Sequence, residues 1–234
     1  AVALVDGGGI ANLVGTHLPG IRTVTPRLLG IALGAAMLVV LGVLDDRGAM
    51  QARTKFIGQV VAATLVVSLG IRATFFVEFP ALSWVGSIVW IVFVINAINF
   101  LDNMDGLAAG ISMIATLFFA IVAGCREQYF VATLAAVTTG AAGGFLLHNR
   151  PPASIFMGDA GSHFLGFLLA VLGILTTYYQ PSGSATPAAV LIPFLILAVP
   201  ILDLLAVVWA RLRQGKPIHV GDHTHISHRF EKMG

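Results

Sequence analysis

Long apolar runs separated by short polar segments constrain this chain more than any other feature of its sequence. Only 10% of the 234 residues are charged, whereas an ordinary soluble domain is about 25% charged. A helix of roughly 20 apolar residues is long enough to cross the ~30 Å hydrocarbon core of a bilayer. We therefore expect an all-α polytopic membrane protein, formed as a single domain over residues 1–234.

Eight segments are apolar enough to be transmembrane helices, and the charges lie in the gaps between them. A short aromatic and β-branched segment, residues 73–80, is expected to form a hairpin at the outer membrane interface. The eight expected spans are residues 1–18, 28–44, 56–71, 84–100, 107–124, 129–147, 162–177 and 188–209.

The loops divide unequally between the two sides of the membrane. Eight spans place loops 45–55, 101–106, 148–161 and the tail 210–234 on one side. Nine Lys and Arg residues lie on that side and four on the other. Because cytoplasmic loops carry the excess of Lys and Arg, we expect this side to face the cytoplasm and the protein to lie in the cell (inner) membrane.

The acidic and histidine residues gather on the same side as the Lys and Arg. Four separate loops that are acidic on one face indicate one assembled site.

The single cysteine, Cys125, excludes an internal disulfide framework. The small net charge of +2 and the absence of a basic stripe argue against binding of nucleic acid.

Two polar motifs supply candidate chemistry where helices end. The pair Asp45-Asp46 can ligate a divalent cation or accept a proton, or it can simply end a helix at the water interface. Asn99 and Asp102 are spaced to share a helical face, while Asn96 lies one turn earlier within the apolar span. Hard oxygen ligands of this kind favour Mg²⁺, with Mn²⁺ as a second choice, over zinc.

Two further motifs have both a functional and a plain structural interpretation. Asp159 precedes a long apolar helix, where exposed N–H groups favour an anion, although Asp159 or Ser162 can equally be an N-cap. His225, His228 and Arg229 in the tail can bind a metal, donate protons or pair with phosphates, or can belong to a surface tract without function.

Together these motifs resemble those of the polyprenyl-phosphate N-acetylhexosamine-1-phosphate transferases, the glycosyltransferase 4 group that includes phospho-MurNAc-pentapeptide translocases. Ser227 stands where the tail motif of that family often has His, so no role for that His carries over. The family usually has more spans, so we expect its terminal helices to be missing here. The matching segments, in the order of the family, are Gly42–Asp46, Lys55–Gln59, Asn96–Gly110, Asn149–Ser162, Pro200–Asp203 and His225–Arg229.

The resemblance implies a Mg²⁺-dependent enzyme that transfers a sugar-1-phosphate from a UDP-sugar to polyprenyl (undecaprenyl) phosphate and releases UMP. GlcNAc-1-phosphate, or a related HexNAc-1-phosphate, is the expected group. This reaction is the first membrane step in the synthesis of cell-wall or surface polysaccharides. The implied partners are the UDP-sugar, the polyprenyl phosphate and membrane lipid, and a homodimer is compatible with the resemblance.

The resemblance also implies a role for each matching residue. Asn99 and Asp159 would hold Mg²⁺. Asp45 would be the base or positioning carboxylate for the lipid phosphate, with Asp46 beside it. The other implied site residues are Asp102 and Asp105 at the nucleotide or metal, Lys55 and Asn96 in substrate binding, Asn149 and Phe156 beside the uridine, and His225, His228 and Arg229 against phosphate charge.

Two other functions remain open. A CDP-alcohol phosphatidyltransferase would explain Asp102-Asn-Met-Asp105-Gly106, but neither an Arg soon after it nor a second Asp-xxx-Asp motif follows. A divalent-metal transporter would use the tail histidines and the intramembrane Asp203, and it predicts acidic residues distributed across the bilayer.

Overall fold

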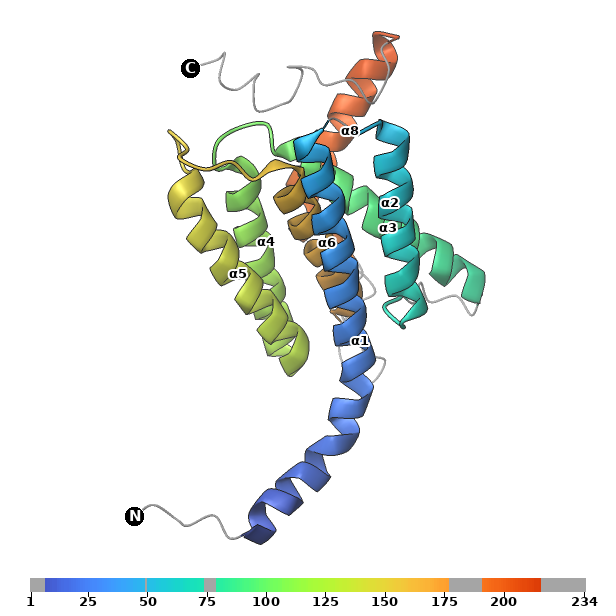
Figure 1. Cartoon of the computed structure of the whole chain (residues 1–234), viewed down its shortest axis with the longest axis vertical. Helices are drawn as coiled ribbons and strands as arrows, with labels where there is room; N and C mark the ends of the chain where they lie inside the picture. The colour runs from blue at the N-terminus through green and yellow to red at the C-terminus, as the bar shows by residue number, and fades with distance from the viewer. Residues whose placement is uncertain (1–6, 49, 74–78, 177–190, 216–234) are drawn as a thin grey trace.

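The computed structural model describes residues 7–48, 50–73, 79–176 and 191–215, with side chains from residue 24 onward (Figure 1). Within these ranges the protein is all-helical, as the apolar runs predict. The tail residues His225, His228 and Arg229 and most of the expected hairpin lie outside the described residues. The helices are α1 (Gly7–Arg47), α2 (Ala52–Ser68), α3 (Pro80–Leu101), α4 (Leu107–Cys125), α5 (Tyr129–Asn149), α6 (Gly158–Leu175), α7 (Ile192–Ile196) and α8 (Ala198–Arg213).

Five helical segments in the described part of the chain are long and apolar enough to cross a membrane. Helices α2, with 17 residues, and α8, with 16, are shorter than the other main helices. The protein is therefore a multi-pass membrane protein, while the count of eight spans stays a prediction. The five segments are Val24–Arg47, Pro80–Leu101, Leu107–Cys125, Tyr129–Asn149 and Gly158–Leu175.

The structure differs from the expected helix boundaries at both ends of the chain. Residues 7–18 of the first expected span and the whole of the second, 28–44, belong to one 41-residue helix, α1. This helix bends as it extends beyond the bundle (Figure 1). The exposed Pro26 removes only one backbone hydrogen bond, so the helix continues past it. The span expected at 188–209 divides at Leu197, because Pro200 fits the first turn of a new helix but not a helix interior.

Helix α6 is the centre of the bundle, and two glycines let its neighbours approach it closely. Of the five candidate spans α6 is the most enclosed, with 61% of its apolar window buried. A Cβ atom at Gly42 of α1 would lie 2.4 Å from the Cα of Ala160, and one at Gly166 would lie 2.7 Å from the Cα of Ile95 in α3. Helices α1 and α3 thus contact α6 backbone to backbone.

This packing determines where the polar helix ends lie. The C-terminal ends of α1 and α3 and the N-terminal ends of α2 and α6 meet at one end of the bundle, the upper end in Figure 1. The loops 45–55, 101–106 and 148–161, expected on one side of the membrane, therefore lie at the same end of the molecule.

Candidate active site

Asp45 at the end of α1 has both carboxylate oxygens engaged. Its Oδ1 accepts a hydrogen bond of 2.6 Å from the backbone N–H of Met50, which holds the turn between α1 and α2. Its Oδ2 lies 2.9 Å from the Nζ of Lys55 in the first turn of α2. The side chain of Asp45 is thereby fixed toward the helix α2 side of the site.

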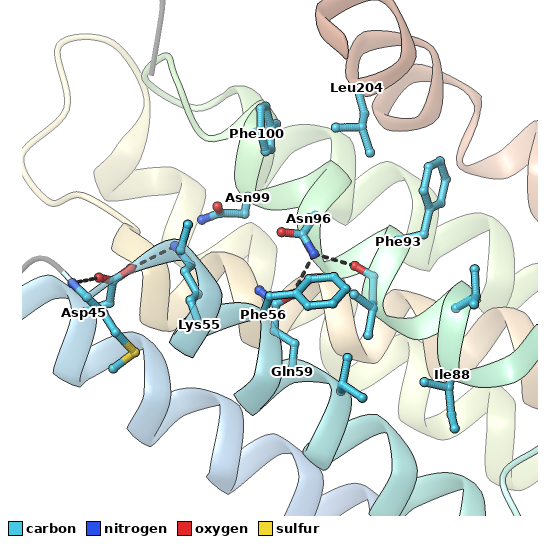
Figure 2. A pocket seen from close by; sticks show the side chains of 15 residues that line it. Asp45, Lys55, Phe56, Gln59, Ile88, Phe93, Asn96, Asn99, Phe100 and Leu204 are labelled. Atoms are coloured by element: carbon cyan, nitrogen blue, oxygen red, sulfur yellow. Dashed lines mark hydrogen bonds and ion pairs between the residues drawn. The ribbon is translucent and has the colours of Figure 1, made fainter. Parts of the chain in front are cut away.

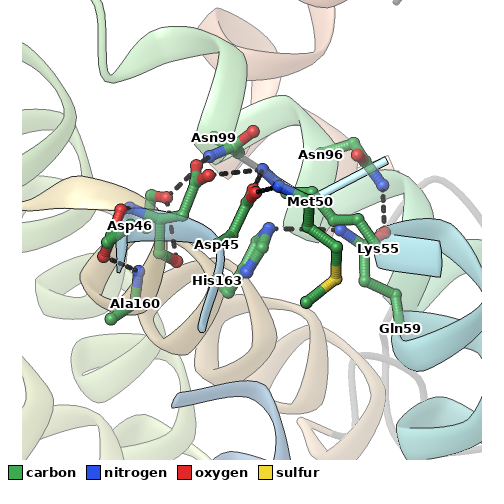
Figure 3. Close-up of polar contacts among 11 residues, drawn as sticks. Asp45, Asp46, Met50, Lys55, Gln59, Asn96, Asn99, Ala160 and His163 are labelled. Atoms are coloured by element: carbon green, nitrogen blue, oxygen red, sulfur yellow. Dashed lines mark hydrogen bonds and ion pairs between the residues drawn. The ribbon is translucent and has the colours of Figure 1, made fainter. Parts of the chain in front are cut away.

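The ammonium group of Lys55 bridges two carboxylates from different helices. Its Nζ lies 2.9 Å from Oδ2 of Asp45 and 2.6 Å from Oδ2 of Asp159 in α6 (Figure 3). Two carboxylates that contact the same ammonium nitrogen are close enough to repel each other, and the positive charge between them offsets this repulsion. The site therefore gathers negative charge from α1 and α6 around one positive charge from α2.

Asp46 caps the N-terminus of α6 from outside that helix. Its Oδ1 accepts the backbone N–H of Asp159 at 2.8 Å, and its Oδ2 accepts that of Ala160 at 3.2 Å (Figure 3). The N–H groups and dipole at a helix N-terminus favour such a carboxylate. Gly158 has φ of +64°, and a Cβ there would lie 2.9 Å from Asp46, so only glycine fits this approach. The N-cap expected from Asp159 or Ser162 is supplied by Asp46 instead.

Asn99 in α3 is held by α6. Its Nδ2 donates to Oδ1 of Asp159 and, at 2.9 Å, to Oγ of Ser162. These two hydrogen bonds use both N–H groups of the amide. The group that Asn99 can offer to a ligand is consequently its carbonyl oxygen, an acceptor.

A cavity of about 820 Å³ opens from this cluster along α2 and α3 (Figure 2). At one end its wall is polar, with Asp45, Lys55, Gln59, Asn96 and Asn99. The rest of the wall is largely apolar and comes mainly from α2 and α3, with one residue from α8. The apolar part includes Phe56, Val60, Ile88, Val89, Val92, Phe93 and Leu204.

Asp102 lies just beyond α3 and has a strongly perturbed acidity. Burial, and then the negative charges of Asp159 and Asp46, raise the pKa of its carboxyl from 3.8 to about 6. Asp102 is the C-cap residue of α3, and its backbone N–H still donates to the carbonyl of Ile98 at 3.1 Å, so Asp102 follows Asn99 by about one helical turn. Its carboxyl is coupled to the site through space, by the two negative charges.

The raised pKa predicts a pH-dependent stability that Asp102→Asn removes. An Asp whose pKa is raised on folding favours the folded state while it is neutral, and this contribution is lost as pH rises from about 4 through about 6. In detergent without divalent cations, we expect the melting temperature of the wild-type protein to fall over this interval. We expect the Asp102→Asn variant to show a flatter profile there. Equal pH profiles for the two proteins, measured by thermal unfolding, would contradict the assignment.

Asp105 and Asn149 join the loops next to the site. Oδ2 of Asp105 accepts the backbone N–H of Ala153 at 2.9 Å. Asn149, only 3% exposed, accepts the N–H of Gly106 at 3.0 Å and donates to the carbonyl of Ile155 at 2.9 Å. These bonds tie the segment after α3 to the segment before α6.

Phe156 lies in that second segment and is 77% exposed. Neither Phe156 nor Asn149 lines the described cavity, and their contact with a uridine stays a prediction. The roles expected for the tail histidines and Arg229 fall outside the described residues.

Three buried polar residues near the site were given no role from their sequence context. Gln59 and His163 are 1% and 0% exposed and contact each other, and Gln59 also lines the cavity. The guanidinium of Arg211 in α8 lies 5.3 Å from the ring centroid of Phe100, which lines the cavity. Polar residues inside apolar helices are costly without a partner, so their presence in α2, α6 and α8 was the available signal.

The oxygen ligands at this site suit a hard divalent cation whose coordination shell is completed by substrate. In the described ranges, no three His, Cys, Asp or Glu side chains lie close enough together to hold a metal. Asp45 and Asp159 nevertheless converge on one cation, the Lys55 ammonium, and Asn99 adds an amide oxygen. Mg²⁺ is usually held by one or two carboxylates together with waters and substrate phosphates. The residues therefore fit Mg²⁺ bound jointly with a phosphate substrate.

Fold and site together define a multi-pass membrane protein with a charged site at one end of its bundle. This site opens to the apolar part of the cavity along α2 and α3, which we call the groove. The family model described as "Glycosyl transferase family 4" matches residues 28–177, and the chain belongs to this family. The match confirms the resemblance seen in the sequence motifs.

Several curated relatives are similar over most of the chain. A probable undecaprenyl-phosphate N-acetylglucosaminyl 1-phosphate transferase of Bacillus subtilis is 37% identical, over 97% of this chain and 65% of its own length. A decaprenyl-phosphate N-acetylglucosaminephosphotransferase of Mycobacterium tuberculosis is 34% identical, over 87% and 57%. A phospho-N-acetylmuramoyl-pentapeptide-transferase of Enterococcus hirae is 33% identical, over 72% and 60%. The chain thus spans about three fifths of the length of these relatives.

Proposed function

We propose that this protein transfers GlcNAc-1-phosphate from UDP-GlcNAc to polyprenyl phosphate and releases UMP, as the first membrane step of a cell-wall or surface polysaccharide. The observation that carries the proposal is the direct opening of the charged cluster into an apolar groove along α2 and α3. The relatives from Bacillus subtilis and Mycobacterium tuberculosis, which are named as N-acetylglucosamine phosphotransferases acting on polyprenyl phosphates, support this choice of group and acceptor.

The shape of the groove suits a lipid phosphate. Polyprenyl phosphate joins a hydrocarbon chain to an anionic head group. The apolar wall formed by residues such as Phe56, Val92 and Phe93 favours the hydrocarbon, and Lys55 at the polar end favours the anion. Because the groove runs along α3, one of the candidate membrane spans, the acceptor can enter it from the bilayer without exposing its prenyl chain to water.

The transfer forms one phosphoanhydride bond and breaks another. An oxygen of the lipid phosphate attacks the β-phosphorus of the UDP-sugar, and the oxygen between the two phosphorus atoms leaves with UMP. Both reactants are anions, so the site must offset their repulsion and align them. Lys55 supplies positive charge, and Asp45, held by Met50 and Lys55, positions the attacking lipid phosphate.

We place Mg²⁺ at Asp159 and Asn99, with Asp45 close by. When bound, the ion would act as a Lewis acid on the diphosphate of the sugar donor. The chain's own residues prepare this place: Asp46 holds the first turn of α6, and Asn99 keeps its carbonyl oxygen free because both of its N–H groups are used.

We also propose that the site faces the cytoplasm, where UDP-sugars are made. Lys55 and Asp159 are in contact, so the loops before α2 and before α6 share one end of the bundle. The excess of Lys and Arg in the segments at this end supports its cytoplasmic placement.

A donor panel tests the proposed function. Purified protein in liposomes with undecaprenyl phosphate is incubated separately with UDP-GlcNAc, with UDP-GalNAc, with UDP-glucose, and with CDP-diacylglycerol plus an alcohol acceptor such as glycerol 3-phosphate. Each incubation is run with and without Mg²⁺, and released nucleotide is measured. We expect UMP from UDP-GlcNAc only when lipid phosphate and Mg²⁺ are both present. Release of CMP alone would instead support the phosphatidyltransferase alternative. Uptake of Mg²⁺ or Mn²⁺ into the liposomes without nucleotide release would support the transporter.

Filling the groove should weaken binding of the lipid selectively. Val89 lines the groove, and a tryptophan there occupies space that the prenyl chain needs. We expect Val89→Trp to raise KM for undecaprenyl phosphate about tenfold, a loss of ~1.4 kcal/mol, with KM for UDP-GlcNAc unchanged. Val137→Trp is the matched control, because Val137 is similarly exposed (66% against 60%) but belongs to α5, which does not line the groove. Equal effects of the two substitutions would argue against the groove as the lipid site.

A further inference from the structure

A row of polar groups joins three helices at the polar end of the cavity (Figure 3). Nδ2 of Asn96 in α3 lies 2.6 Å from Oε1 of Gln59 in α2, and Nε2 of Gln59 lies 3.2 Å from Nε2 of His163 in α6. Gln59 and His163 are fully buried, and Gln59 and Asn96 both line the cavity. The proposed transfer reaction does not use Gln59 or His163 directly.

One backbone carbonyl determines the direction of every hydrogen bond in this row. The oxygen of Val92 can only accept, and it lies 2.7 Å from the Asn96 side-chain nitrogen. Asn96 therefore presents its N–H groups to Val92 and to Gln59, so the Gln59 atom facing Asn96 is its oxygen. The Gln59 amide nitrogen then faces His163 and donates to it. The Nε2 of His163 must accept, which makes the ring neutral with its proton on Nδ1.

The same direction determines what Asn96 offers to a ligand. Both of its N–H groups are used, one by Val92 and one by Gln59. Its carbonyl oxygen is the polar atom left for the cavity, where Asn96 forms part of the polar wall (Figure 2). A rotation of the amide by 180° would turn its oxygen toward the Val92 carbonyl and would lose that bond. Asn96 is thus held as an acceptor.

We infer that Gln59 and His163 are positioning residues that hold the Asn96 carbonyl oxygen toward a hydrogen-bond donor of the nucleotide sugar. This inference rests on the proposed function. An ionised lipid phosphate offers acceptors only, whereas a nucleotide sugar carries hydroxyl and amide N–H donors. The acceptor at Asn96 therefore selects the nucleotide sugar and not the lipid.

A purely space-filling role does not account for these side chains. Within the described part of the chain, Nδ1 of His163 is buried without a hydrogen-bond partner, and an apolar side chain of similar volume would avoid that cost. Neither Gln59 nor His163 has contact with bulk water to favour a polar side chain. The polar side chains of Gln59 and His163 are explained if they fix the orientation of Asn96, the residue at the end of the row.

Two substitutions at His163 separate positioning from packing. In glutamine, Oε1 is as many bonds from Cβ as Nε2 is in histidine, so His163→Gln retains an acceptor for Gln59. In asparagine the oxygen is one bond closer, so His163→Asn loses that acceptor although it is also a polar amide. We expect KM for UDP-GlcNAc to rise about tenfold in His163→Asn and no more than about threefold in His163→Gln. We expect KM for undecaprenyl phosphate and kcat to change less than about twofold in both.

Equal kinetics of the two variants would overturn the inference. So would a proportional rise of KM for both substrates in His163→Asn, because that pattern indicates a general loss of packing.

A spectroscopic measurement tests the same hydrogen bonds without any turnover. In protein labelled with ¹⁵N-histidine in detergent micelles, the resonances missing from the His163→Gln variant belong to His163. We expect a neutral ring with the proton on Nδ1, and a changed Nε2 shift in Gln59→Leu, which removes the donor. A proton on Nε2 would overturn the inference. If the wild-type protein released no UMP, the proposed function would fail while this measurement still decided the direction of the row.

Discussion

Replacing Asp159 by asparagine is expected to reduce transfer of GlcNAc-1-phosphate by about 10²–10³-fold while the protein remains folded. One oxygen of Asp159 accepts from Asn99 and the other pairs with Lys55 at 2.6 Å. Asparagine has nearly the same shape, so the packing of α6 persists. It carries no charge, however, and it must turn an N–H group toward Asn99 or Lys55, both of which are donors here. The variant thus removes the negative charge on which Lys55 and the proposed Mg²⁺ site depend.

UMP release at saturating substrates measures the effect, and thermal unfolding in detergent shows whether the fold is retained. Glu127→Gln is the matched control, because it also converts an acid to its amide but at an exposed position just after α4. We expect this control to keep wild-type turnover. A loss smaller than about threefold in Asp159→Asn would remove this carboxylate from the mechanism.

The second large effect is expected from a single methyl group at Gly42. A Cβ there would lie 2.4 Å from both the backbone N and the Cα of Ala160, and backbone atoms cannot rotate away as a side chain can. Helices α1 and α6 must therefore separate at this point. Overpacking of this kind typically costs about 1–3 kcal/mol of stability. Asp45 and Asp46 lie within about one turn of Gly42, so they move away from the first turn of α6. A displacement of about 1 Å at a reacting centre can reduce turnover about 10²-fold.

We expect Gly42→Ala to lower both the melting temperature and UMP release, with the greater effect on release. Gly144→Ala is the matched control, because Gly144 is also inside a membrane helix, α5, but has open space where a Cβ would lie. Alanine favours a helix more than glycine does, so the control is expected to be neutral or slightly stabilising. Normal turnover in Gly42→Ala would mean that the approach of α1 to α6 does not position the site.

The apolar runs predict most of the helices, because a membrane helix is recognised by continuous hydrophobicity over a known length. Helix α4 was expected at 107–124 and lies at Leu107–Cys125, and α5 was expected at 129–147 and lies at Tyr129–Asn149. The predicted helix boundaries were wrong in the N-terminal part of the chain, because hydrophobicity does not show whether a helix continues through a polar stretch. Residues 19–27 are polar enough to suggest a loop, yet α1 runs through them. Arg27 is exposed, and a charged side chain on a helix surface does not interrupt the helix backbone.

The polar motifs predict which segments meet, but not how their side chains pair. The structure brings Asp45, Lys55, Asn99 and Asp159 into direct contact, as four motifs at helix ends on one side of the membrane suggest. The capping of α6 by Asp46 was not predictable, because it depends on the crossing of two helices far apart in sequence. The contact of Gln59 with His163 was hidden for the same reason. No local pattern encodes a partner more than a hundred residues away.

The most direct test of the account follows the fate of the transferred phosphate. UDP-GlcNAc labelled with one isotope in the sugar and another at the β-phosphorus is incubated with the protein, Mg²⁺ and undecaprenyl phosphate in liposomes, and the lipid is extracted. Attack at the β-phosphorus predicts that both labels enter the lipid in equal amounts, with one UMP released for each. Sugar label in the lipid without the phosphorus label would mean attack at the sugar carbon, and it would contradict a site arranged for transfer of a sugar phosphate.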